Sequence, residues 1–321
     1  MINTSTLDPI VAAILEATVR APSSHNTQPW RFQARQQTIQ LYADRTRALP
    51  VSDPHDRELI ISCGCALLHL RVAAAGIGVA STVRLWCQPD DPDHIATITL
   101  DPAGAAPASD AELDNYIEVR RTYRKRFEPR QIPDSVLDEL CAAATAEGAS
   151  LTVLSSEELR HQTAALIADG DALLWHNPSW RRELAQWMHP RRTGDGLTVP
   201  WLVAPFTQAV VRSFDMGDGE AAKDRQYADE SPVLAVLTTA GDTPIDWLCA
   251  GQALARVLLQ ACQHGVQASY LNQPIQLPEL RLKLQTLLGD PGNPQILLRM
   301  GYPAGEVPPS PRRHFQEFLD S

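Results

Sequence analysis

The feature of this sequence that most limits its fold is a short interruption, DPAGAAPASDAE at residues 101–112, with helix-like and strand-like patterns on both sides. Proline, alanine, glycine and serine dominate the stretch and no hydrophobic period runs through it, which is typical of a linker. Because helices and strands interleave before it and again after it, we predict two α+β units. We place the units at residues 1–108 and 109–321.

Hydrophobic spacing predicts the elements of each unit. In the first unit we expect a helix over residues 7–19, a strand at 39–42, a helix capped around 52–54, and strands at 79–86 and 95–100. In the second unit we expect a helix from residue 133, strands at 151–154, 232–239, 266–270 and 295–300, and a long helix over residues 247–265.

The composition indicates a globular chain whose partners are neither nucleic acid nor membrane. Of the 321 residues 44 % are hydrophobic, and the formal charge is −10 at pH 7. An acidic chain is a poor general partner for nucleic acid or for an anionic membrane surface. We find no run of about 18 apolar residues and no basic targeting segment at the start, so we expect a cytoplasmic protein.

Six cysteines are spread along the chain, which predicts reduced and mostly buried thiols. Two of them form a Cys-Gly-Cys stretch, a spacing that a metal or redox site can also use. Their place in an apolar helical pattern, without a second pair at zinc spacing, favours structural thiols. The six are Cys63, Cys65, Cys87, Cys141, Cys249 and Cys262.

The segment RAPSSHNTQPW, residues 20–30, places six consecutive hydrogen-bonding side chains directly after the first expected helix. It is either a helix end followed by an ordinary polar loop or a turn that binds a ligand. Ser24 and His25 do not indicate a hydrolase, because neighbouring residues rarely face each other as nucleophile and base. The chain also lacks the GxSxG and HExxH patterns of common hydrolases.

Two basic clusters stand out in this acidic chain, RRTYRKRF at residues 120–127 and SPRRH at residues 310–314. Either cluster alone could be a solvated face or a loose tail. Together they favour a bound phosphate, because the planar guanidinium group matches phosphate oxygens. No glycine-rich phosphate loop competes for this role, since the Gly-Ile-Gly stretch at 76–78 follows a helix instead of opening one.

The two motifs together resemble those of a known family. RAPSSHNTQPW resembles the RAPSxxNxQPW segment of FMN-dependent nitroreductases, and RRTYRKRF resembles their RRSxRxF motif. In the usual member the arginine motif comes first within one domain, and each flavin lies between two chains. Here the order is reversed across the linker, so each unit has half of a flavin site. The resemblance, to the tandem Acg-like branch, implies an intrachain pseudo-dimer with one FMN site at the junction, in a chain that can be monomeric.

The resemblance also implies which residues bind FMN. The polar segment would contact the ring and ribityl group, and the arginine motif and SPRR would bind the phosphate. Asn272 and Gln273 stand where the family has backbone amides that face flavin N5, and Lys223 or Arg225 would supply a positive charge near N1; a solvated charged loop is the alternative for that pair. The predicted set is Pro22, Ser23, Ser24, Asn26, Gln28, Arg120, Arg121, Thr122, Arg124, Lys223, Asn272, Gln273, Ser310, Arg312 and Arg313.

The implied activity is oxidation of NAD(P)H by a ping-pong mechanism, in which flavin N5 passes a hydride to a small nitroaromatic or quinone-like acceptor. No side chain is expected to be catalytic and no metal is expected. Two alternatives stay open: a protein that binds or sequesters FMN without turnover, and a structural or anion-binding protein without flavin. Residues 175–220, with four tryptophans, form either a lid over the site or a helical hairpin packed on the core.

Overall fold

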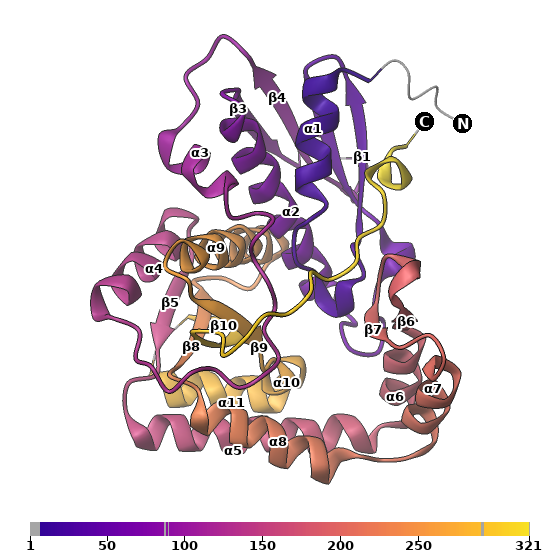
Figure 1. Cartoon of the computed structure of the whole chain (residues 1–321), viewed down its shortest axis with the longest axis vertical. Helices are drawn as coiled ribbons and strands as arrows, with labels where there is room; N and C mark the ends of the chain where they lie inside the picture. Colours follow the sequence, from indigo (N-terminus) through magenta and orange to yellow (C-terminus); the bar gives the residue numbers. More distant parts are fainter. Residues whose placement is uncertain (1–6, 87, 89, 290–291, 321) are drawn as a thin grey trace.

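The structure is a computed structural model that describes residues 7–86, 88, 90–289 and 292–320. Its first unit is built on an antiparallel sheet with the strand order β1-β2-β4-β3 (Figure 1). The elements of this unit are α1 (Pro9–Thr18), η2 (Ser24–Asn26), β1 (Trp30–Arg35), β2 (Thr38–Ala43), η3 (Arg45–Arg47), α2 (Arg57–Gly76), β3 (Ala80–Leu85), β4 (His94–Asp101) and α3 (Ala108–Asp114).

The second unit is built on another antiparallel sheet, with the order β5-β8-β10-β9. A separate parallel pair, β6-β7, lies at its periphery. The elements are α4 (Asp134–Ala146), β5 (Ser150–Val153), α5 (Glu157–His176), α6 (Pro178–Gln186), β6 (Met188–Pro190), η4 (Arg191–Thr193), β7 (Leu197–Val199), α7 (Ala204–Ser213), α8 (Gly217–Glu230), β8 (Val233–Thr239), α9 (Pro244–Gln263), β9 (Gln267–Tyr270), α10 (Gln273–Gln276), α11 (Pro278–Leu288), β10 (Asn293–Gly301) and η5 (Phe315–Phe318).

The two units repeat one design. Each has a helix, two strands, a 20-residue helix and two more strands, and the strands occupy the same places in the two sheets. The main difference lies between the first two strands of each unit. A two-residue turn joins β1 to β2, whereas α5 to α8 separate β5 from β8. The predicted pseudo-dimer of two α+β units is thereby confirmed.

The two long helices, α2 and α9, form the contact between the units. They approach each other so closely that only glycine fits at the crossing. A Cβ on Gly64 would lie 2.9 Å from the Cα of Gly251, and a Cβ on Gly251 would overlap the carbonyl oxygen of Ile61. The backbones of α2 and α9 are therefore in direct contact, which fixes the relative position of the units.

Burial explains the apolar sequence of α2. Among the described residues it is the one helix long and apolar enough to cross a membrane, and 89 % of the apolar stretch is buried inside the protein. Its two cysteines, Cys63 and Cys65, are fully buried thiols, and burial raises the pKa of both. No cluster of metal-ligating side chains occurs in the described part of the chain. The described cysteines are free, as expected, and Cys87 lies outside the described residues.

Two connecting segments cross from one unit to the other. After α3 the chain runs along β9, where Thr122 pairs with Ala268, and this segment carries the arginine motif. After β10 the chain returns to the first unit, where Leu319 pairs with Phe32 of β1. Figure 1 shows this last segment, in yellow, passing from the second sheet up to β1. Both basic clusters therefore lie at the junction.

Three expectations about elements need correction. Strand β1 was not predicted, although WRFQAR alternates apolar and polar residues and β1 forms a hairpin with β2. The expected linker contains α3, which packs against α2 and α9. Helix α2 begins at Arg57 instead of near residues 52–54, and the Asp53 carboxylate accepts a hydrogen bond from the Leu59 amide inside its first turn. The domain boundary at residue 108 stays a prediction.

Candidate functional site

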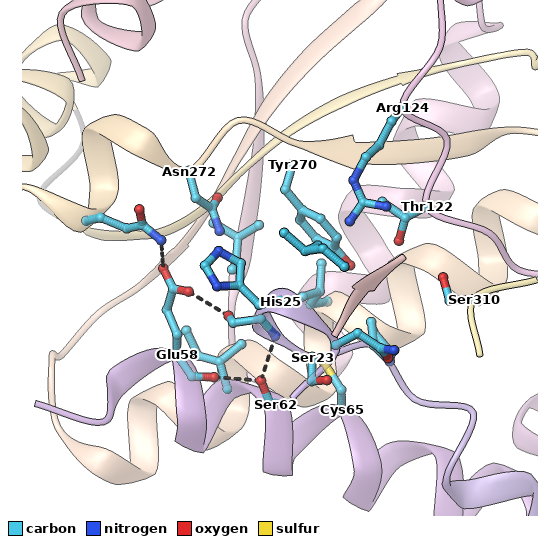
Figure 2. A pocket seen from close by; sticks show the side chains of 18 of the residues that line it. Ser23, His25, Glu58, Ser62, Cys65, Thr122, Arg124, Tyr270, Asn272 and Ser310 are labelled. Atoms are coloured by element: carbon cyan, nitrogen blue, oxygen red, sulfur yellow. Dashed lines mark hydrogen bonds between the residues drawn. The ribbon is translucent and has the colours of Figure 1, made fainter. Parts of the chain in front are cut away.

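A cavity of about 260 Å³ lies between the two units. The loop after α1 and one face of α2 line it from the first unit. The crossing segment, α5, α6, β7, β9, α10 and the C-terminal segment line it from the other side. Its lining includes residues 22–26, 58, 61, 62, 65, 120, 122, 124, 171, 180, 197, 254, 270, 272, 273, 276, 296, 310 and 312. Figure 2 shows Thr122, Arg124 and Ser310 on one side of this cavity and Glu58 and Asn272 on the other.

One end of the cavity is strongly basic. Arg120, Arg124 and Arg312 line it, and within the described residues none of the three forms an ion pair. Arg120 is 7 % exposed, and its Nε and Nη1 are buried and have no hydrogen-bond partner in the described part of the chain. Burial, with Arg120 as the largest neighbouring charge, lowers the pKa of Arg312 to about 9. Buried cations without counter-charges are costly, so this end is suited to an anion.

Arg312 joins the C-terminal segment to the end of α1. Its guanidinium donates hydrogen bonds of 2.9 Å to the Val19 carbonyl, 3.0 Å to the Ala21 carbonyl and 2.9 Å to the Asn26 side-chain oxygen. The carbonyls at a helix C-terminus carry partial negative charge, which stabilises a cation there. Arg312 is thus a structural tie whose positive charge also faces the cavity.

The polar segment after α1 connects three parts of the chain. The Asn26 side chain donates a 3.1 Å hydrogen bond to the Pro311 carbonyl, and the Gly196 amide donates a 3.2 Å bond to the Asn26 carbonyl. The Gln28 side chain is fully buried; it donates to the Gly194 carbonyl at 3.0 Å and accepts from the Arg313 amide at 3.2 Å. These polar side chains hold the segment against the 194–196 turn and the C-terminal segment.

The same segment stores backbone strain. His25, Asn26 and Gln28 have φ values of 48°, 56° and 54°, in the left-handed region that residues with a Cβ rarely adopt. Such conformations persist only where surrounding contacts enforce them, and they concentrate at functional sites. The contacts of Asn26 and Gln28 supply that enforcement here.

The end opposite the arginines carries carboxyl groups. Glu58, 3 % exposed, accepts hydrogen bonds of 2.5 Å from the Ser24 hydroxyl and 3.1 Å from the Gln276 amide. His25 lies beside it, and burial lowers the pKa of this imidazole although the Glu58 charge raises it (Figure 2). Asp171 also lines the cavity. The cavity is therefore basic at one end and acidic at the other.

Helix α6 and the β6-β7 pair close one side of the cavity with Trp180 and Leu197. Two buried carboxylates fasten this segment to the first unit. Glu183 accepts from the backbone amides of Val51 and Ser52 at 2.8 and 2.9 Å and from the Ser52 hydroxyl at 2.5 Å. Asp195 accepts from the Arg47 guanidinium and from His189 Nδ1. In this structure the segment is closed over the cavity.

Known proteins are similar in sequence to this chain over nearly its full length. A Mycobacterium tuberculosis (strain H37Rv) protein named "Putative NAD(P)H nitroreductase acg" is 31 % identical over 323 residues, covering 99 % of this chain and 97 % of the relative. The chain belongs to the Acg-like branch of the nitroreductase family. A second relative from the same strain, "Putative NAD(P)H nitroreductase Rv3131", is also 31 % identical, over 97 % of this chain and 91 % of the relative. No family model matches the chain.

This nitroreductase-family chain also matches the crystal structure of a nitroreductase with bound FMN from Bacteroides fragilis. The matched region covers 61 % of the present chain and 91 % of the Bacteroides fragilis chain. The identity is 16 % and the TM-score is 0.41.

Most of the predicted site residues of this nitroreductase-family chain lie on the cavity. Residues from four separate segments meet there, although up to 290 positions separate them in sequence. The residues brought together are Pro22, Ser23, Ser24, Asn26, Arg120, Thr122, Arg124, Asn272, Gln273, Ser310 and Arg312. Several of their polar groups are occupied within the protein, since the Ser23 hydroxyl accepts from the Gln28 amide at 2.9 Å.

Four predicted site residues lie elsewhere. Gln28 is buried in the contact with the 194–196 turn. Arg121 bonds the Arg120 carbonyl at 2.9 Å and lines a smaller surface hollow. Lys223 pairs with Glu220 at 3.0 Å on α8, and Arg313 pairs with Glu317 at 3.3 Å and stacks on Phe318. These four placements share one cause: a motif gives the position of a residue in the chain but not the direction of its side chain.

Several cavity residues escaped prediction. Tyr270, Gln276 and Asp171 carry no motif, and Glu58 belongs to a helix that sequence reasoning treated as core. His25 lies inside the recognised segment and was considered as a catalytic base but not as a lining residue. The positive φ at His25, which turns its ring into the cavity, has no sequence signature comparable to a glycine.

Proposed function

We propose that this protein is an FMN-dependent NAD(P)H oxidoreductase of the nitroreductase type that reduces small nitroaromatic or quinone-like acceptors. The observation that carries the proposal is the set of unpaired guanidinium groups at one end of the cavity between the units. Buried cations without counter-charges destabilise a folded protein, so their presence at this end favours a bound anion that neutralises them. The names of the relatives favour the same interpretation.

The residues present suit FMN. Arg120, Arg124, Thr122 and Ser310 would hold the phosphate, since they combine unpaired donors and hydroxyl groups at one end. The cavity is also lined by apolar groups and by the Tyr270 hydroxyl, which is buried and has no hydrogen-bond partner among the residues that the structure describes. These residues would enclose a flat aromatic ring and leave the carboxyl end for NAD(P)H and the acceptor. The apolar lining residues are Ile61, Cys65, Leu254 and Ile296.

FMN, when bound, supplies the hydride chemistry, so the chain's own contribution is binding, electrostatics and exclusion of water. Arg120 and Arg124 would offset the phosphate charge and raise the affinity for FMN. Trp180 and Leu197, on the closing segment, would keep bulk water from the reacting ring. NAD(P)H and the acceptor would use the same space in turn, which predicts ping-pong kinetics.

Flavin content and turnover test the proposal. We expect the purified protein, after incubation with FMN and removal of the excess, to retain one FMN per chain. NADH or NADPH should then bleach the flavin absorbance, and menadione or a nitroaromatic should sustain NAD(P)H oxidation. Protein that stays colourless after this incubation would contradict the proposal, and two FMN per chain would contradict the single site.

A second candidate function, sequestration of FMN without turnover, is favoured by the closed segment over the cavity. Glu183 and Asp195 hold that segment with buried hydrogen bonds, which limits access to a bound ring. The same experiment separates the two functions. Bound FMN that neither NADH nor NADPH reduces, but that dithionite does reduce, would favour sequestration.

A further inference from the structure

The cavity lining includes a carboxyl group that FMN binding does not require. Asp171, on α5, lines the cavity and is 4 % exposed. Its Oδ1 accepts a 3.1 Å hydrogen bond from Gln273 Nε2, whereas Oδ2 is buried without a partner within the described residues. A buried carboxylate oxygen without a donor is costly. We therefore expect Asp171 to hold a proton on Oδ2.

Close packing of α5 against α10 fixes the position of this carboxyl. A Cβ on Gly170 would lie 2.9 Å from the carbonyl carbon of Gln273, so the approach requires glycine at residue 170. The neighbouring residue, Asp171, is thereby held against the Gln273 side chain at the edge of the cavity. The carboxyl is positioned by two packed helices instead of by a mobile loop, as a proton donor requires.

Burial, together with a second carboxyl group, keeps the proton on Asp171. The same Gln273 nitrogen donates a 2.6 Å hydrogen bond to Asp224 Oδ2 on α8, so two carboxyl groups share one amide. Burial, and next the charge of Asp224, raises the pKa of Asp171 to about 7. Glu220 acts in the same direction, whereas Gln273 and Lys223 oppose it. Near neutral pH Asp171 can therefore both give up and regain a proton.

We propose that Asp171 is a catalytic acid that delivers a proton to the acceptor as it is reduced, an inference that rests on the oxidoreductase function proposed above. In the reduction of a quinone, NAD(P)H supplies a hydride through the bound flavin to one quinone oxygen. The O–H bond of Asp171 breaks, and its hydrogen forms an O–H bond at the other quinone oxygen. The product is the hydroquinone, and solvent reprotonates the Asp171 carboxylate.

Two acceptors distinguish proton delivery from a structural role. The FMN-loaded full chain is reduced anaerobically with NAD(P)H and then mixed with menadione, which takes up protons, or with ferricyanide, which takes up electrons alone. We expect Asp171→Asn to slow reoxidation by menadione about 100-fold and to leave reoxidation by ferricyanide unchanged. The wild-type rate with menadione should fall above about pH 7, and the variant should lack that decrease.

The control is Asp169→Asn, an exposed carboxyl on the same helix, which should behave like the wild type with both acceptors. If reoxidation of the Asp171→Asn variant is slowed equally with both acceptors, Asp171 has a structural role and the proposal is overturned. An unchanged rate of reoxidation by menadione would also overturn it. If NAD(P)H does not reduce the bound FMN, the proposed function fails. Dithionite then supplies the electrons, and the same comparison decides the role of Asp171.

A readout without flavin tests the protonation itself. Infrared difference spectra of the cofactor-free full chain should show a carboxylic acid C=O band that disappears as the pH rises through about 7. The band should be missing in Asp171→Asn and present in Asp169→Asn. Loss of the Asp171 band near pH 4, the ordinary range of an aspartic acid, would overturn the proposal independently of any activity.

Discussion

The buried Arg120 side chain lowers the stability of the cofactor-free protein but is suited to bind an anion. Two of its guanidinium nitrogens are buried without a partner among residues 7–86, 88, 90–289 and 292–320, and the third makes a 3.4 Å contact to the Arg20 carbonyl. Arg121, the next residue, instead donates to the Glu118 and Arg120 carbonyls. Of two adjacent arginines, one is satisfied within the protein and the other is left for an anion.

Replacing Arg120 with methionine should weaken FMN binding without lowering the stability of the cofactor-free protein. We expect Arg120→Met to weaken FMN binding by about 10- to 100-fold, because one charge-assisted hydrogen bond to phosphate is worth about 1.5 to 3 kcal/mol. The cofactor-free variant should be no less stable than the wild type, since an unpaired buried charge is removed. Fluorescence titration with FMN and urea denaturation measure the two effects.

Arg121→Met is the matched control, and its FMN affinity should equal that of the wild type. If the two variants lose FMN affinity equally, the direction of the side chain does not decide phosphate binding. That result would contradict the assignment of the phosphate to Arg120.

At the scale of the elements, the crossing of α2 and α9 decides the geometry of the site. Both helices contribute to the cavity, through Glu58, Ile61, Ser62 and Cys65 on α2 and Leu254 on α9. Their contact at Gly64 and Gly251 leaves no room for a side chain. The position of each lining residue relative to the others therefore depends on this crossing.

A single added methyl group should disturb the crossing. Gly251→Ala would place a Cβ against the Ile61 carbonyl oxygen and should lower the free energy of unfolding by about 1 to 3 kcal/mol, the usual cost of overpacking. Gly219→Ala, in α8 with nothing within 4 Å, should instead raise it by about 0.5 to 1 kcal/mol through helix propensity. Urea denaturation measures both. A Gly251→Ala protein as stable as the wild type would argue against the close approach.

The segment from α6 to β7 is the element that covers the site, and Glu183 is its main attachment. Glu183→Ala removes three hydrogen bonds to Val51 and Ser52, so we expect this segment to open. Release of FMN should become at least about 10-fold faster, and limited proteolysis should cut within residues 187–203. Arg182→Ala, exposed on the same helix, should release FMN at the wild-type rate. The lid interpretation is abandoned if both variants release FMN alike.

For the whole molecule, the two units share one core. A continuous cluster of buried apolar residues extends from Val11 to Phe318 and includes both long helices. A buried charge network reinforces it: Arg256 Nε donates to Glu147 at 2.7 Å, Arg256 Nη2 to Asp110 at 2.8 Å, and Arg71 to Glu147 at 2.7 Å. The second unit adds two smaller clusters of its own, one that includes Ile167, Leu234 and Leu284 and one that includes Trp175 and Trp180.

The shared core predicts cooperative unfolding. We expect one calorimetric transition, with a van't Hoff enthalpy equal to the calorimetric enthalpy. Glu147→Gln, which weakens the charge network between the units, should lower the temperature of that transition without splitting it. Two resolved transitions in the wild type would mean that the units fold independently.

The sequence by itself determined the family, the α+β class and most of the elements. Long periodic segments such as α2 and α9, and strands bounded by turn residues such as β8 and β10, were predicted because local spacing reflects burial on one face. The two motifs, in reversed order across the chain, determined the pseudo-dimer. Helix α3 escaped because it is short and its boundaries depend on neighbours, whereas β1 was missed although its sequence WRFQAR alternates apolar and polar residues.

Only the tertiary structure decided which polar side chains face the cavity. Arg120 and Arg121 are equivalent in a motif, yet only Arg120 lines the cavity. Asp171 lacks any motif and became visible only when α5, α8 and α10 brought it beside Asp224 and Gln273. The physical reason is the same in both cases: the charge that a buried group carries depends on its neighbours in space, and local sequence does not specify those neighbours.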